Sequence, residues 1–262
     1  MSDDQTYCGV VSVLGAPNAG KSTLVNRMVG AKVSIVSPKV QTTRIRVRGV
    51  SLYANTQIIY VDTPGIFVPK RRLDRAMVDA AWGGAADADA IILLVDAQRG
   101  VDKDTQRIIE GLNKRKSTAS LVLNKVDAVR REDLLGLSEK LNGMADFSAT
   151  FMVSALKGGG VTDLEAKLRT LMPEGPWLFP EDEISDLPQR LLAAEITREK
   201  AYLYLHQELP YALAVGTESW EDFNNGEVRI EQAITVARDS HKGIVVGKGG
   251  QMIRRIRAEA QD

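Results

Sequence analysis

The sequence predicts an α/β protein with a doubly wound, mainly parallel sheet, followed by a smaller α+β domain. Three observations predict this organisation. A glycine-rich loop at residues 15–22 stands between an apolar run suited to a buried strand and a segment with helical spacing. Strand and helix patterns then alternate from residue 7 to residue 171, which is the order of a right-handed, doubly wound sheet. At residue 172 the composition changes to a proline-rich, acidic connector that is too irregular for either element.

The composition favours a soluble globular protein in a reducing compartment, with the cytoplasm as the default. Hydrophobic residues make up 44% of the chain, yet the longest apolar runs, such as residues 90–95, are too short to cross a bilayer. No signal peptide is visible. The single cysteine, Cys8, excludes a disulfide framework and a thiolate metal cluster. Basic and acidic residues balance at 34 each, so a nucleic-acid surface has to be argued from local clusters.

The loop at residues 15–22, Gly-Ala-Pro-Asn-Ala-Gly-Lys-Ser, matches the P-loop pattern and lies between a strand and a helix, as that motif requires. Its glycines let backbone N–H groups converge on an anion at a helix N-terminus. Lys21 would reach the terminal phosphates of a nucleotide, and the Ser22 hydroxyl would bind Mg²⁺. The alternative is a glycine-rich turn with an exposed lysine. The expected nucleotide ligands in this loop are Gly15, Asn18, Ala19, Gly20, Lys21, Ser22 and Thr23.

The next segment predicts a mobile loop and a hairpin. Residues 32–44 are polar and interrupted by proline, and two strands are expected after them, at residues 45–50 and 57–61. The second strand is followed directly by an Asp-x-x-Gly motif. Ligands collect at the carboxyl ends of strands in an open parallel sheet, so Asp62 would hold Mg²⁺ and the Gly65 amide would meet a γ-phosphate.

An Asn-Lys-x-Asp motif follows the strand expected at residues 119–123 and points to guanine. The Asp127 carboxylate can accept two N–H bonds from the Watson–Crick edge of guanine, which adenine cannot offer in that arrangement. Asn124 would bond the opposite edge of the base, and the Lys125 stem would cover the ring. The alternative is a polar helix N-cap at Asn124 or Asp127.

The remaining elements of the first domain complete the sheet. Strands are expected at residues 91–96 and 149–153, and helices at residues 105–116 and 161–171. The backbone N–H groups after the last strand are candidates to bind the guanine carbonyl, at Ser154, Ala155 and Leu156. We place this domain at residues 1–172 and a linker at residues 173–186.

The second domain, residues 187–262, predicts a small α+β fold that binds RNA. Residues 187–208 have helical spacing, and two strands, 211–220 and 228–237, are joined by the hairpin signal Asn-Asn-Gly. A Gly-x-x-Gly loop at residues 247–250 then opens a basic, amphipathic helix, which lets the backbone approach a phosphodiester closely. An ordinary glycine turn before a helix is the alternative. The expected RNA contacts are Gly247, Lys248, Gly249, Gly250, Arg254 and Arg255.

Taken together, these motifs resemble the Era family of bacterial GTPases, in which a G domain precedes a KH domain. The resemblance covers nearly the whole chain and includes Gln-Thr-Thr-Arg at residues 41–44, Pro-Glu-Asp-Glu-Ile at 180–184 and Glu-Leu-Pro-Tyr at 208–211. It implies a GTP-hydrolysing switch that binds the 3′ region of small-subunit (16S) rRNA and assists assembly of the 30S ribosomal subunit. It also implies a cytoplasmic monomer, often with peripheral association with the inner membrane.

The resemblance implies roles for the site residues as well. Lys21 would cradle the β- and γ-phosphates, and a threonine of the first switch loop would join Ser22 at the metal, Thr43 being our choice and Thr42 the alternative. The catalytic residues are then Lys21, Thr43 and Gly65, and the Mg²⁺ ligands are Ser22, Thr43 and, through water, Asp62.

The sequence departs from the pattern of Ras-type GTPases at Ile66, where those proteins carry a water-orienting glutamine. An aliphatic side chain cannot orient water by hydrogen bonding, so intrinsic hydrolysis of GTP to GDP and phosphate should be slow and need a partner or an ion. Asn18 resembles the asparagine of potassium-dependent relatives and is expected to place K⁺ beside the phosphates.

A second departure concerns the KH-type domain, which looks C-terminally truncated, because the family pattern has a further strand and helix after the Gly-x-x-Gly helix. We expect the sheet edge left open to be unstable. Two other functions remain open on the sequence alone. One is an RNA chaperone with a mainly structural nucleotide site, suggested by Ile66. The other is a membrane-signalling GTPase, against which the lack of a lipid-anchor motif argues.

Overall fold

The computed structural model describes residues 5–37, 39, 42–43, 46–69, 72–205 and 209–261. Gln41, Arg44 and Glu208, which carry part of the family resemblance, lie outside the described residues. The chain divides into two compact units, of which the first comprises residues 1–34 and 43–186 and the second residues 35–42 and 187–262. The sequence did not indicate that residues 35–42 group with the second unit, nor that the expected linker groups with the first.

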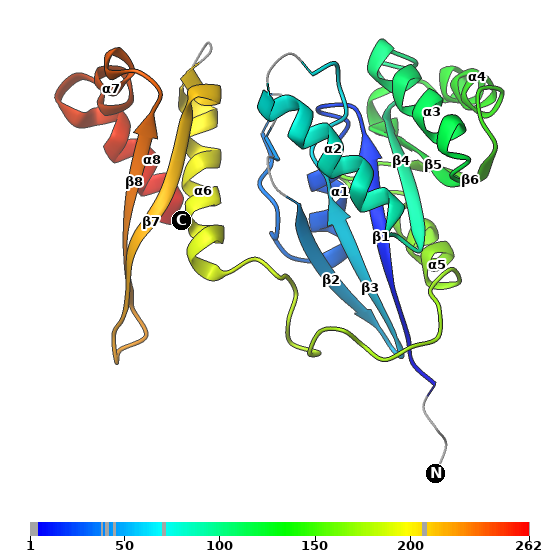
Figure 1. Cartoon of the computed structure of the whole chain (residues 1–262), viewed down its shortest axis with the longest axis horizontal. Helices are drawn as coiled ribbons and strands as arrows, with labels where there is room; N and C mark the ends of the chain where they lie inside the picture. Colours follow the sequence, from blue (N-terminus) through cyan, green and yellow to red (C-terminus); the bar gives the residue numbers. More distant parts are fainter. Residues whose placement is uncertain are drawn as a thin grey trace. The chain divides into compact units, whose positions relative to one another are not determined.

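A six-stranded sheet forms the centre of the first unit, in the order β2-β3-β1-β4-β5-β6 (Figure 1). Its strands are β1 (Tyr7–Gly15), β2 (Val47–Tyr53), β3 (Thr56–Asp62), β4 (Ala90–Asp96), β5 (Ala119–Asn124) and β6 (Phe147–Val153). All neighbours pair in parallel except β2, which returns antiparallel to β3 as the expected hairpin. The predicted fold class, a doubly wound and mainly parallel sheet, is confirmed.

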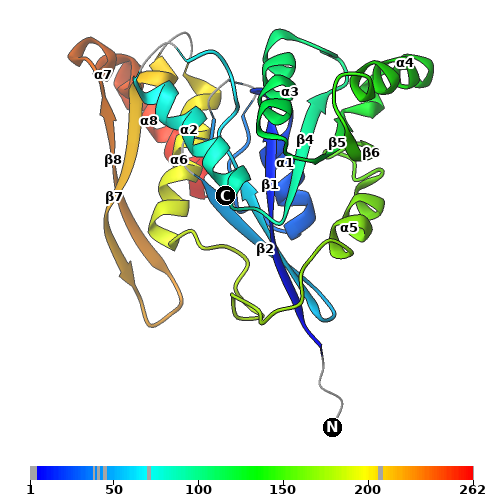
Figure 2. The same cartoon turned by 45° about the vertical axis from the view of Figure 1, so that its right-hand side comes forward.

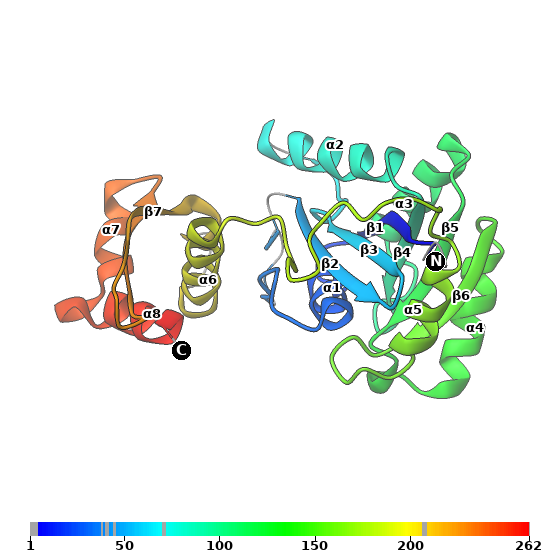
Figure 3. The same ribbon diagram turned by 90° about the horizontal axis from the view of Figure 1, so that it is seen from below.

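Helices cover both faces of this sheet. They are α1 (Lys21–Val29), α2 (Arg72–Ala86), α3 (Lys103–Arg115), α4 (Arg131–Asn142) and α5 (Val161–Arg169), with a short 3₁₀ turn η1 at Val126–Ala128. The apolar residues of α1 and α5 pack on one face, and those of α2, α3 and α4 pack on the other. Figure 3 shows α1 and α2 on opposite sides of the β2–β3 hairpin. The carboxyl ends of the parallel strands are therefore left free for a ligand.

The connector after α5 runs back along the edge of the sheet. The Val50 N–H of β2 donates to the Ile184 carbonyl at 2.8 Å, and Gly49 forms an isolated bridge with Ser185. At the other end of the connector, Tyr7 bridges Glu174. These hydrogen bonds cover part of the β2 edge, which would otherwise present unpaired backbone groups.

The second unit packs helices against a two-stranded ribbon, which lies beside α6 (Figure 2). Its elements are α6 (Gln189–Tyr204), η2 (Leu209–Ala212), β7 (Leu213–Asp222), β8 (Val228–Val236), α7 (Asp239–Val246), η3 (Lys248–Gly250) and α8 (Gln251–Gln261). Their core contains Ala201, Leu205, Leu213, Val245 and Ile256. The antiparallel β7–β8 hairpin was expected, whereas no element was expected at α7. Among the helices that the structure describes, none has both the length and the apolar content to span a bilayer.

Two buried charges on α6 hold the segment at residues 35–42 within the second unit. The Glu199 carboxylate accepts a hydrogen bond from the Val36 N–H at 2.7 Å, and the Arg198 guanidinium donates to the Thr42 carbonyl at 2.6 Å. Arg198 also forms an ion pair with Glu195. Arg198 is 2% exposed and Glu199 is 5% exposed, so these contacts supply the hydrogen-bond partners that their buried charges need.

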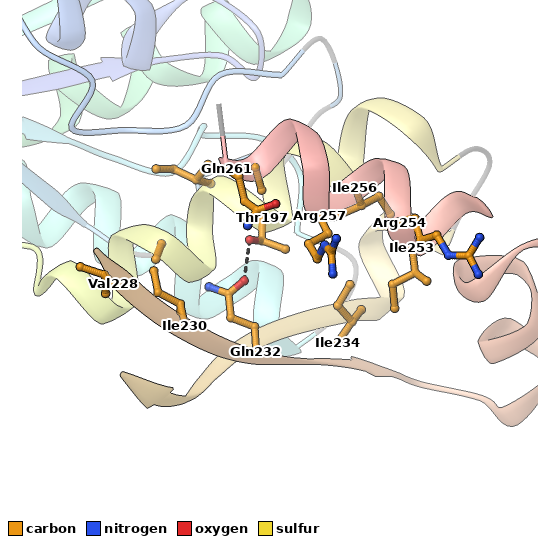
Figure 4. A pocket seen from close by; sticks show the side chains of 13 residues that line it. Thr197, Val228, Ile230, Gln232, Ile234, Ile253, Arg254, Ile256, Arg257 and Gln261 are labelled. Carbon is orange, nitrogen blue, oxygen red and sulfur yellow. Dashed lines mark hydrogen bonds between the residues drawn. The ribbon is translucent and has the colours of Figure 1, made fainter. Parts of the chain in front are cut away.

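A groove of about 710 Å³ lies between α6, β8 and α8 (Figure 4). Its walls are largely aliphatic, and the Thr197 hydroxyl donates to the Gln232 side-chain oxygen at 2.6 Å within it. Arg254 and Arg257 of α8 also line it. Along the described residues, β8 pairs with β7 and shows no second strand partner.

Candidate nucleotide and RNA sites

The P-loop is formed where β1 ends at Gly15 and α1 begins at Lys21. The Lys21 ammonium folds over the loop and donates to the carbonyls of Gly15 and Ala16, at 3.2 and 3.0 Å. Burial lowers the pKa of Lys21 to about 8, an effect that the charge of Asp62 opposes. The loop therefore holds a buried cation whose charge an anionic ligand would stabilise.

Two glycines permit close approaches around the loop. Gly20 has a φ of +98°, and a Cβ there would overlap the Asn124 side-chain amide. A Cβ on Gly65 would lie 3.0 Å from the Pro17 backbone, so the Asp-x-x-Gly motif lies directly against the P-loop. Gly65 therefore lies beside the loop that is expected to hold the phosphates.

The Asp62 carboxylate is the centre of an oxygen-rich cluster. It is fully buried, and its Oδ2 accepts hydrogen bonds from the Ser22 and Ser34 hydroxyls at 2.7 and 2.5 Å. Thr43 Oγ1 lies 3.0 Å from Ser22 Oγ and 3.3 Å from Asp62 Oδ2. The other oxygen, Oδ1, is buried and has no hydrogen-bond partner among the described residues. Burial raises the pKa of Asp62, and the hydroxyls counteract this.

These donors fit Mg²⁺, because carboxylate and hydroxyl oxygens are the hard ligands that the ion prefers. A cation would also satisfy the buried Oδ1 atom of Asp62. Of the two threonines considered, Thr43 reaches the cluster, whereas the Thr42 hydroxyl donates to the Lys39 carbonyl at 2.7 Å. Ser34 was not anticipated, since a lone serine in a polar loop carries no signal in the sequence.

Ile66, Asn18 and Arg99 lie in the P-loop or contact it. Ile66 is fully buried in the core under α2 and α3, and its N–H donates to the Gly15 carbonyl at 3.1 Å. Its side chain therefore cannot hold an attacking water. Asn18 adopts the left-handed conformation, with a φ of 63°. Arg99 donates to the neighbouring Pro17 carbonyl at 3.0 Å, a contact that the sequence did not predict.

Asn124 has partners other than those expected. Its amide nitrogen donates to the Ala19 carbonyl at 2.8 Å, and its oxygen accepts from the Ala155 N–H at 3.0 Å. The Ser154 N–H donates to the Gly159 carbonyl at 2.9 Å. Asn124 thus ties the P-loop to the loop after β6. The N–H groups of Ser154 and Ala155, expected to face a guanine carbonyl, are paired within the protein, while Leu156 is exposed.

Asp127, the carboxylate expected to read the base, lies in η1 just beyond β5. Lys157 Nζ is 3.2 Å from its Oδ2. A hydrogen bond from Ser154, and then the interaction with Lys157, lower the pKa of Asp127. The carboxylate therefore stays ionised and can accept hydrogen bonds from a base at neutral pH.

The Gly-x-x-Gly loop forms η3 and leads directly into α8. Gly247, Gly249 and Gly250 all have positive φ, at 73°, 59° and 77°. Lys248, Arg254 and Arg255 are exposed, and the guanidinium of Arg255 stacks over the Tyr204 ring at 4.0 Å. The loop can approach a phosphodiester closely, with Lys248 and Arg254 supplying positive charge.

Binding of a polyphosphate should be linked to proton uptake by Lys21. In the free protein its pKa is about 8, and phosphate charges would raise it, so binding above pH 8 takes up most of one proton and weakens as pH rises further. Calorimetric titration with GDP at pH 8.5 in two buffers of different ionisation enthalpy measures this uptake. A Lys21→Arg variant, which cannot lose its charge, should show none. Equal heats for the unaltered chain in both buffers would contradict the prediction.

Comparison with known proteins agrees with this arrangement. Residues 10–125 match the family model described as 50S ribosome-binding GTPase, and residues 208–262 match the KH domain model. GTPase Era of Rhizobium meliloti strain 1021 is 59% identical over 98% of this chain and 82% of its own length. GTPase Era of Sinorhizobium medicae strain WSM419 is 60% identical over 98% of this chain and 83% of its own.

Two solved structures share the fold of both units. Era in complex with MgGDPNP and nucleotides 1506–1542 of 16S ribosomal RNA has a TM-score of 0.92 and 38% identity, covering 97% of this chain and 87% of that one. An Aquifex aeolicus Era variant bound to GDP·AlF₄⁻ has a TM-score of 0.92 and 37% identity over the same shares. With the motifs, the fold and these relatives in agreement, the chain belongs to the Era family of GTPases.

Proposed function

We propose that this chain is a GTP-hydrolysing switch that binds the 3′ region of 16S rRNA and assists assembly of the 30S subunit. The cluster at Asp62 carries the proposal, because a fully buried carboxylate with one unsatisfied oxygen and three adjacent hydroxyls calls for a cation beside the P-loop. Era relatives and an Era structure solved with this RNA segment support the RNA part.

Ser22 and Thr43 would hold Mg²⁺, with Asp62 acting through water. When bound, the ion neutralises charge on the β- and γ-phosphates of GTP. Lys21 would turn from the P-loop carbonyls to these phosphates, and Gly65 would present its amide to the γ-phosphate. Asp127 would accept the N–H groups of guanine. These assignments make Lys21, Thr43 and Gly65 the residues closest to the reaction.

The slow intrinsic rate that we propose follows from Ile66, whose burial leaves its place in the site without a polar group. We place K⁺ beside Asn18, where a monovalent cation would offset charge developing on the phosphates. RNA would bind along η3 and the start of α8. We also propose domain bounds of 1–172 and 187–262 around a linker at 173–186, a monomeric state and a cytoplasmic location with peripheral inner-membrane contact.

Phosphate release from GTP tests the enzyme against the alternative of an RNA chaperone with a structural nucleotide site. Release should rise when 30S subunits are added, and it should be about tenfold faster in KCl than in NaCl because K⁺ contributes transition-state stabilisation. A Lys21→Ala chain serves as the blank. Release at the level of this blank under all conditions would favour the chaperone, and equal rates in the two salts would remove K⁺ from the proposal.

A further inference from the structure

The end of β4 carries a buried carboxylate that the P-loop chemistry does not use. Asp96 is the last residue of β4, and its side chain is 8% exposed. Its Oδ1 accepts the Gln98 N–H at 3.0 Å, and its Oδ2 lies 2.6 Å from Lys125 Nζ. With a fixed donor on each oxygen, the carboxylate is held in one orientation.

Lys125 is the residue that this carboxylate holds. It follows β5 directly and has a φ of 63°, a conformation that sends the chain from the strand into η1. Asp96 and Asn124 are paired in the β4–β5 register, and the Ala97 N–H donates to the Asn124 carbonyl at 2.9 Å. The two strand ends are therefore joined by both backbone and side chain. The Lys125 side chain remains 35% exposed, so its stem is accessible to a ligand.

We propose that Asp96 is a positioning residue for nucleotide binding, which acts by holding the Lys125 stem in place for the face of the guanine ring. The inference rests on the proposed function, since it assumes that guanine occupies the site read by Asp127. Without its partner, Lys125 would sample several rotamers, and binding would have to order them at an entropic cost. Asp96 removes most of that cost before the nucleotide arrives.

A residue that positions Lys125 should change the affinity for nucleotides without changing the selectivity between purine bases. The lysine stem meets the ring face, which guanine and hypoxanthine share, whereas Asp127 reads the edge, where hypoxanthine lacks the exocyclic amine. Loss of Asp96 should therefore weaken GDP and IDP by the same factor. Loss of an edge contact should weaken them by different factors.

The experiment is a double-mutant cycle on the full chain with Asp96→Asn and Lys125→Met, read by the dissociation rates of fluorescent GDP and IDP. Asn keeps the shape of Asp, and Met keeps an unbranched stem without charge. We expect Asp96→Asn to release both nucleotides about tenfold faster, which corresponds to an ordering cost of about 1.4 kcal/mol. In the Lys125→Met background, Asp96→Asn should have no further effect. Asp133→Asn, which removes an exposed ion pair with Arg130, should leave both rates unchanged.

Melting of each nucleotide-free variant shows whether it folds, and Lys125→Met alone should reproduce the faster release if Asp96→Asn does not fold. An equal effect of Asp96→Asn with and without Lys125 would overturn the inference, because the carboxylate would then act through the fold. A changed ratio of GDP to IDP rates would also overturn it. If the unaltered chain bound neither nucleotide, both the proposed function and the inference would fail. If it bound the nucleotides and only the variants departed from expectation, the inference alone would fail.

Discussion

Replacing Asp127 with Asn should exchange the base preference of the site from guanine to xanthine. A carboxylate would accept the two N–H groups of the guanine edge, whereas an amide presents one acceptor and one donor. Guanine would then place its exocyclic amine against the donor group of the amide, and xanthine, with a carbonyl in place of the amine, would restore the match. We expect GDP affinity to fall on the order of 10⁴-fold, the loss typical of a site built to hydrogen-bond its ligand. Competition between GDP and xanthosine diphosphate for a labelled nucleotide measures both changes.

The control is again Asp133→Asn, an acid-to-amide change on α4 that should leave both affinities as they are. The experiment also has to separate base recognition from an effect on Lys157. The Lys157 ammonium forms an ion pair with the Asp127 carboxylate, so a displaced Lys157 is a second source of lost GDP affinity. A loss of GDP affinity without any gain for the xanthine nucleotide would identify that cause and contradict base reading by Asp127.

The framework of the first unit was predictable because buried parallel strands are continuous apolar runs. The run that became β4 is an example, since its residues pack on both faces of the sheet. Helix α2 was not assigned, because Gly83 and Gly84 interrupt its pattern and no capping residue marks its start. Helix α7 was also missed, since its Ile-Val-Val run is more typical of a strand than of a helix. The grouping of residues 35–42 with α6 depends on two buried charges whose partners are backbone atoms.

The sequence predicted which residues lie at the strand ends that form the site, but it did not predict the contacts of their side chains. Parallel strands bring Asp62 and Asn124 to one edge of the sheet whatever their side chains do. The choice between Thr42 and Thr43, by contrast, depends on side-chain direction, which a polar loop does not encode in its pattern. The partners of Asn124 depend in the same way on distances between separate loops. The ion pair of Asp96 with Lys125 joins residues that the sequence places in different elements, so only the fold reveals it.

The RNA side of the switch should fail when Gly249 is replaced by Asp. A Cβ at this position meets nothing within 4 Å, and although φ is +59°, Asp and Asn tolerate that region better than other side chains. The loop should therefore keep its shape while gaining a negative charge next to the RNA phosphates. We expect binding of a short oligonucleotide from the 3′ end of 16S rRNA to weaken about 100-fold, since opposed like charges cost several kcal/mol.

Gly249→Asn is the matched control, because it has the same shape and backbone strain without the charge. Its affinity should remain within about threefold of the unaltered chain, so that the difference between the two variants measures the charge alone. That difference should also shrink as salt is added, because ions screen the repulsion. Equal losses in Asp and Asn would show that backbone strain, not phosphate proximity, had disabled the loop.

The same three chains decide whether nucleotide and RNA are coupled. Binding is measured with GDP and with a non-hydrolysable GTP analogue, and the ratio of the two RNA affinities gives the coupling free energy directly. By reciprocity, RNA must then change the ratio of the affinities for the GTP analogue and for GDP by the same factor, which provides an independent check. A ratio near one would mean that the cycle acts on another partner. A ratio above one that disappears in Gly249→Asp and persists in Gly249→Asn would establish that the nucleotide gates RNA through this loop.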